Sequence, residues 1–152
     1  MKFNNKTFEE KGYQRIDKLI DIEKIVEARK EINKIAKNEE LSGDSCFYVN
    51  RKDTLGNAIT DRREAQRVWN LCNKSKAIGD IILNKEIENA MKKIFHRKYD
   101  GDLYRLSSVQ ANILYPGAKA QKIHIDTPFP EPIPQWPAKA NCIIMIDEFT
   151  ED

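Results

Sequence analysis

The chain has 152 residues, of which 40% are hydrophobic, enough to fill a core and to argue against wholesale disorder. Charged residues make up 33% of the sequence, yet the net charge is only +2, which argues against a dedicated nucleic-acid-binding protein with its strongly basic face. The three cysteines lack C-x-x-C spacing, no apolar run approaches membrane-spanning length, and the N-terminal residues lack the apolar stretch of a signal peptide. We therefore expect a cytoplasmic protein with reduced thiols, and neither a nucleic-acid nor a membrane partner.

The first two elements that the sequence predicts are helices. Thr7 and Glu10 have the T-x-x-E spacing of a capping box, so we expect a short helix that begins there and ends at Gly12. After Asp21, a good N-cap residue, apolar side chains recur at helical spacing over about residues 22 to 38. This single apolar stripe predicts a long amphipathic helix.

The middle of the chain predicts one strand and three further helices. Cys46 to Asn50 is expected to be a short strand. A helix is predicted from four apolar residues at helical spacing: Ala65, Val68, Trp69 and Cys72. Another is expected over residues 77 to 83, and a third follows Asn84, which is suited to be its N-cap.

From about residue 100 the pattern becomes typical of strands. Val109 to Leu114 is expected to be a strand closed by Pro116-Gly117, a dipeptide suited to a type II turn. Gln121 to Asp126 alternates with period two, as a half-buried strand does. Cys142 to Ile146 is continuously apolar and is expected to be a strand buried on both faces.

The segment from Gln121 to Asp126 carries the residues of chemical interest. In a strand, alternate side chains share a face, so His124 and Asp126 would project together and could bind one metal ion. Nitrogen and oxygen ligands with open positions suit iron(II) in a two-histidine, one-carboxylate arrangement. The alternative is a structural histidine hydrogen-bonded to a nearby carboxylate at a strand end.

The surroundings of this pair resemble the phytanoyl-CoA dioxygenase family, whose members look like N-P-G-x-x-x-Q-x-x-H-x-D followed by a loop and an apolar strand with an acidic end. The corresponding residues are Asn112, Pro116-Gly117, Gln121, His124, Asp126 and Cys142 to Glu148. The opening F-E-E-K-G-Y-Q-R-I, before a long amphipathic helix, is also similar to the family's usual start.

This resemblance implies a fold and an activity. The family fold is a double-stranded β-helix, a jelly roll related to the cupins, and its members use iron(II), 2-oxoglutarate and dioxygen to hydroxylate a small organic substrate. It implies His124 and Asp126 as metal ligands. Asn112 and Gln121 are candidate residues of the cofactor pocket, although strand alternation puts Gln121 on the face opposite His124 unless a bulge intervenes.

The sequence departs from the family in its last part. The family needs a second histidine and an arginine downstream, but the 26 residues after Asp126 contain neither, and His96 is expected to be an ordinary residue at a helix end. We therefore expect a single incomplete α+β domain, truncated at its C-terminal end and inactive alone. Residues 1–100 would form a helical cover, and residues 101–152 the first strands of a partial jelly roll that begins near residue 103. The alternatives are a non-redox, cupin-like module that binds a ligand or metal, and an inactive remnant that binds a partner chain.

Overall fold

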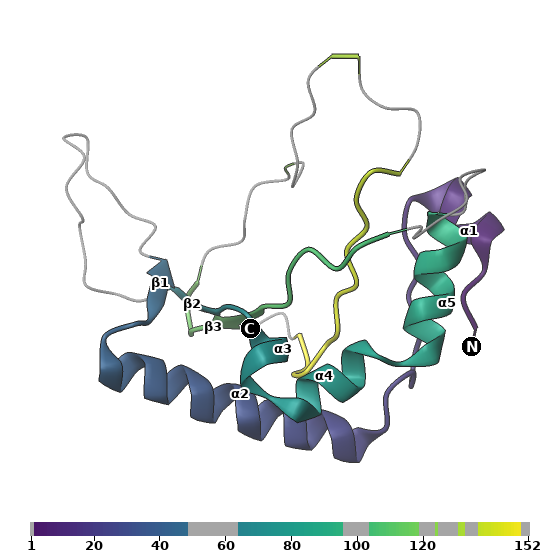
Figure 1. Ribbon diagram of the computed structural model, residues 1–152. Helices are drawn as coiled ribbons and strands as arrows, with labels where there is room; N and C mark the ends of the chain where they lie inside the picture. The colour runs from purple at the N-terminus through teal and green to yellow at the C-terminus, as the bar shows by residue number, and fades with distance from the viewer. Residues whose placement is uncertain are drawn as a thin grey trace.

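The computed structural model describes residues 2–48, 64–95, 104–118, 124, 131–132 and 137–149. In these residues the protein is α+β, with five helices and one three-stranded antiparallel sheet (Figure 1). The helices are α1 (Asn5–Lys11), α2 (Ile22–Ser42), α3 (Leu71–Lys74), α4 (Lys76–Ile82) and α5 (Lys85–Ile94). The strands are β1 (Cys46–Tyr48), β2 (Ala65–Val68) and β3 (Ala111–Leu114).

Local capping explains both ends of the first helix and the end of the second, whereas the Asp21 side chain makes no capping hydrogen bond at the start of the second. The side-chain oxygen of Asn4 accepts a hydrogen bond from the backbone N–H of Thr7 at 3.1 Å, so α1 begins earlier than the predicted capping box. Gly12 ends α1 as predicted, with φ 74°. The long helix is also confirmed: α2 follows Asp21 and continues to Gly43, whose φ of 81° and N–H contacts to the last carbonyls end it.

The sheet has the order β1-β2-β3, so β2 is its central strand. The prediction of a helix through Ala65 and Val68 was wrong, because these residues form β2 and pair with strands on both sides. The sheet therefore begins at Cys46 instead of near residue 103, and residues 1–100 include two of its strands as well as the helices. The strand predicted from Cys46 is confirmed in its described residues, and the strand predicted over Val109 to Leu114 is confirmed from Ala111 onward.

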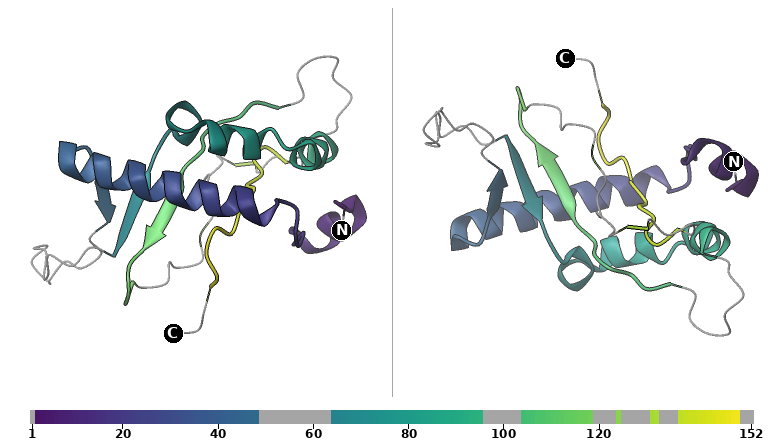
Figure 2. Two further views of the ribbon diagram at one scale, coloured as in Figure 1. Left: turned by 90° about the horizontal axis from the view of Figure 1, so that it is seen from below. Right: turned by 90° about the horizontal axis from the view of Figure 1, so that it is seen from above.

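The α2 helix crosses one face of the sheet, and Figure 2 shows this from below and from above. Its apolar side packs on β2 and on α3 and α4 in one buried cluster: Ala28, Ile32, Ala36, Val68, Leu71, Ile78 and Ile81. The two predicted helices after residue 76 are confirmed, and the Asn84 side chain caps α5 by accepting from the Glu86 N–H at 2.8 Å. None of the described helices is long and apolar enough to span a membrane.

The C-terminal segment, residues 137–149, lies against this core without joining the sheet. Ile144 and Ile146 pack on the buried cluster, whereas Ile143 and Met145 are 80% and 53% exposed. The prediction of a strand buried on both faces was therefore wrong. Alternate side chains of this run are therefore packed and exposed. Because every residue of the run is apolar, the sequence shows no period-two pattern that would predict this half-buried arrangement.

Candidate functional site

The two faces of the sheet differ in what covers them. Alternation along β2 sends Gln66 and Val68 toward α2, where both are buried, and sends Arg67 to the other side. Cys46 and Asn112 are the partners of Arg67 in the neighbouring strands, so these three residues share one face. We call this the outer face of the sheet.

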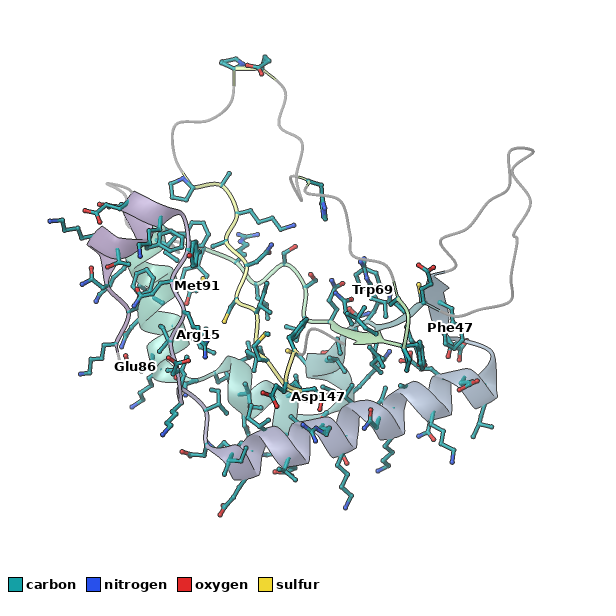
Figure 3. The ribbon with its side chains drawn as sticks, turned by 180° about the vertical axis from the view of Figure 1, so that it is seen from behind. Arg15, Phe47, Trp69, Glu86, Met91 and Asp147 are labelled. Carbon is teal, nitrogen blue, oxygen red and sulfur yellow. The ribbon has the colours of Figure 1, made fainter. Side chains whose placement is uncertain are left out.

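Arg67 is the centre of the outer face. Its Nε–H donates to Oδ1 of Asn112 at 3.0 Å, and its guanidinium carbon lies 5.3 Å from the centroid of the Trp69 ring. Figure 3 shows Trp69 on the side of the sheet away from α2. The amide fixes one edge of the guanidinium and the ring supports its plane, so a cation is held in place over the sheet.

Sequence reasoning placed Asn112 in the candidate pocket but missed Arg67 and Trp69. Both lay in the stretch that was predicted to be a helix, where arginine would be a solvated residue. The signal that could have revealed them is the alternation of Gln66, Arg67, Val68 and Trp69, with a β-branched and an aromatic residue that favour strands. Asn112 is exposed on the outer face.

The end of β3 is anchored to the core by the buried side chain of Gln66, which is only 2% exposed. Its amide nitrogen donates to the carbonyl of Ala36 at 3.0 Å and to the hydroxyl of Ser45 at 3.1 Å. Its amide oxygen accepts from the hydroxyl of Tyr115 at 3.0 Å. One side chain thus joins α2, the residue before β1, and the residue that follows β3.

The Pro116-Gly117 turn then leads away from this anchor. Ala118 N–H donates to the carbonyl of Tyr115 at 2.9 Å, and Gly117 has φ 78°. A positive φ at the third residue is what a type II turn requires, so the predicted turn is confirmed. The segment that carries the H-x-D pair therefore starts at a fixed point next to the sheet.

The structure describes one member of the predicted metal pair. His124 is exposed. Gln121, Asp126 and His96 lie outside the described residues, so the predicted convergence of His124 and Asp126 stays a prediction. Within the described parts of the chain, no group of three or more histidine, cysteine, aspartate or glutamate side chains is placed to hold a metal ion.

The C-terminal segment is tied to α2 by Arg29. This side chain donates to the carbonyl of Ile146 at 2.9 Å and forms an ion pair with Asp147. Cys142 is exposed as a residue, yet neighbouring protein atoms desolvate its thiol enough to raise its pKa above the ordinary value. The neutral thiol is therefore its form near pH 7, and it is a poor candidate for a metal ligand or nucleophile.

Comparisons with models of known protein families, with curated proteins and with solved structures find no match to this chain.

Proposed function

We propose that this chain forms part of the active site of an iron(II)- and 2-oxoglutarate-dependent oxygenase of the phytanoyl-CoA dioxygenase type, with His124 and Asp126 as two metal ligands. The observation that carries the proposal is the H-x-D pair, seven residues after the Gly117 of a Pro-Gly turn that itself closes a strand. Imidazole and carboxylate are donors that suit iron(II) with open coordination positions.

The arrangement around the turn supports this site. The helices occupy one face of the sheet, while the outer face carries Arg67, Asn112 and Trp69, polar and aromatic groups suited to a small polar ligand. The anchor from Gln66 to Tyr115 holds the start of the segment that leads to His124. Part of the proposal is that the three strands belong to a double-stranded β-helix whose interior faces the outer side of the sheet.

In this proposal each residue has a limited role. His124 and Asp126 hold the metal, and Asn112 and Gln121 line the pocket of the cosubstrate. Bound iron(II) would let dioxygen convert 2-oxoglutarate to succinate and carbon dioxide while one oxygen atom enters a C–H bond of the substrate. The protein holds the reactants in place and excludes competing reactions.

The proposal is tested in a longer protein that contains this chain together with a second histidine and an arginine downstream, by adding iron(II) and 2-oxoglutarate without oxygen and recording the charge-transfer absorption of the chelated keto acid. The absorption should appear with this longer protein and disappear when it carries His124→Ala or Asp126→Ala. The matched control is His96→Ala, because His96 is the only other histidine of the sequence. Absorption that survives the change at His124, or that is absent from the unmodified longer protein, would refute the ligand assignment.

Turnover separates an oxygenase from a non-redox module. With oxygen, an oxygenase site converts 2-oxoglutarate to succinate even without its organic substrate, at a low uncoupled rate. A cupin-like module would bind metal through His124 and produce no succinate. In the longer protein we expect succinate formation that requires both iron(II) and His124.

A further inference from the structure

We infer that a cavity of about 350 Å³ in the N-terminal part of the chain binds a small organic phosphate monoester. The residues that line this cavity include Lys2, Thr7, Lys11, Tyr13 and Arg15. Figure 3 shows Arg15 at the opposite end of the molecule from Trp69, which lies at the sheet. The inference therefore goes beyond the proposed function and does not depend on it.

The first step of the argument is that hydrogen bonds fix the backbone around the cavity. The side chain of Gln14 accepts from the N–H of Asn4 at 2.7 Å and donates to the carbonyl of Lys2 at 3.3 Å. Asn4 in turn accepts from the N–H of Thr7 at 3.1 Å and so caps α1. The wall of the cavity is thus ordered before a ligand arrives, which lowers the entropic cost of binding.

This frame is also fixed to the rest of the protein. Phe3 is buried, and its ring centroid lies 5.5 Å from that of Phe8 in α1. The carbonyl of Phe3 accepts from Nζ of Lys93 in α5 at 3.4 Å. Lys2 is therefore held next to α1, although the first residues of a chain are often loosely packed.

The second step is charge. Lys2 and Lys11 form no ion pair with any residue that the structure describes, whereas Nε of Arg15 lies 2.6 Å from Oδ1 of Asp17. Among the described residues that line the cavity, none is an aspartate or a glutamate. Two uncompensated ammonium groups thus share one cavity. A phosphate monoester, with a charge of about −1.5 to −2 near pH 7 and three acceptor oxygens, matches two lysines, whereas a carboxylate carries a single charge.

The third step concerns the organic part of the ligand. Tyr13 lines the cavity and leaves 67% of its surface exposed, so its ring offers a flat apolar face beside the two cations. The hydroxyl of Thr7 adds a neutral hydrogen-bond donor for a phosphate oxygen. The volume is at the lower end of the range for small-molecule cavities, about 300–1,000 Å³, and suits a ligand with one ring and one phosphate.

The test uses phenyl phosphate and the whole chain, and it follows the backbone N–H signals of the cavity residues by NMR. We expect saturable shifts in the unmodified chain and a loss of affinity of about tenfold or more in Lys11→Met, because a charge-assisted hydrogen bond is removed. Lys6→Met is the matched control. It removes the same charge from the same helix, but Lys6 lies outside the cavity lining and 4.0 Å from Glu10. Its affinity for phenyl phosphate should equal that of the unmodified chain.

A second variant tests the organic part separately. Tyr13→Leu should weaken the binding of phenyl phosphate about two- to tenfold, because the aromatic contact is lost, and should leave the weaker binding of inorganic phosphate unchanged. Lys11 and Tyr13 are both exposed, so circular dichroism of the variants should match that of the unmodified chain. His124→Ala should not change the affinity for phenyl phosphate, which keeps this test independent of the oxygenase proposal.

Three results would overturn the inference. Equal losses in Lys6→Met and Lys11→Met would show general attraction to a basic surface instead of a site. Equal affinities for phenyl phosphate and inorganic phosphate would show that the cavity does not recognise an organic ester. An absence of saturable shifts at the cavity residues would show that the ligand does not bind there.

Discussion

The buried side chain of Gln66 joins the sheet to α2. A buried amide lowers stability unless its donors and acceptor are all used, and Gln66 uses them on Ala36, Ser45 and Tyr115. Because Tyr115 directly precedes the Pro-Gly turn, this residue determines where the segment toward His124 begins. Its role could not be predicted from sequence, since a glutamine directly before an arginine carries no sign of burial.

Gln66→Leu should therefore destabilise the protein although it puts a more apolar residue into the core. The change leaves a carbonyl and two hydroxyls without their partner, and we expect a loss of about 1–3 kcal/mol in the free energy of unfolding. Urea unfolding followed by circular dichroism measures this. Gln110→Leu, at an exposed position before β3, is the matched control and should stay within about 0.5 kcal/mol. Equal stability of the two variants would contradict the buried network.

Two helix ends were predicted correctly, because capping depends on local chemistry: Gly12 ends α1 and Asn84 caps α5. The start of α1 at Asn5 and the end of α2 at Ser42 differ from the prediction. The stretch from Ala65 to Val68 was predicted worst. Four apolar residues between Ala65 and Cys72 fit helical spacing by coincidence, and only the pairing of β2 with β1 and β3, which are distant in the sequence, makes this stretch a strand.

Two glycines of the helical layer should respond to alanine with opposite signs. Gly43 has φ 81°, so Gly43→Ala places a side chain in left-handed backbone and should lower the free energy of unfolding by about 1 kcal/mol. Gly79 lies inside α4, and a Cβ there would meet no atom within 4 Å. Gly79→Ala should therefore raise the free energy of unfolding by about 0.5–1 kcal/mol. Thermal unfolding of both variants tests this; a loss in Gly79→Ala would contradict the assigned helix.

The α+β class of the whole molecule followed from sequence, but the placement of its layers did not. A sheet that begins at β1 before most of the helices, and a C-terminal segment that packs on the core outside the sheet, are products of long-range contacts. The candidate site also depends on contacts between residues that are distant in the sequence. Pro116-Gly117 and the H-x-D pair were visible in the sequence, whereas Arg67 joined Asn112 only through the register of β2 and β3.

Arg29 holds the C-terminal segment to α2, and the alkylation rate of Cys142 in the same segment measures whether this contact is made. Desolvation raises the pKa of the Cys142 thiol, so alkylation by iodoacetamide should be slow near pH 7 and accelerate as the pH rises through that raised pKa. Arg29→Met removes the bonds to Ile146 and Asp147 and should shift the rate profile to lower pH as the segment opens.

Mass spectrometry of the alkylated protein distinguishes Cys142 from the half-buried Cys46 and Cys72. Arg15→Met is the control, and its profile at Cys142 should match that of the unmodified chain. The exposed ion pair contributes at most about 1 kcal/mol to global stability, so the melting temperature should change little. An unchanged profile in Arg29→Met would show that the segment is held by Ile144 and Ile146 alone.

In the proposed site, a metal bound by His124 and Asp126 lies over the outer face of the sheet. Manganese(II), a paramagnetic substitute for iron(II), broadens the NMR signals of nearby nuclei with a steep dependence on distance. Substoichiometric manganese(II) should broaden the side-chain signals of Arg67, Asn112 and Trp69 before those of α1, and His124→Ala should abolish this. Broadening centred on α1 or on the acidic residues of α2, or broadening of the outer face that persists without His124, would contradict it.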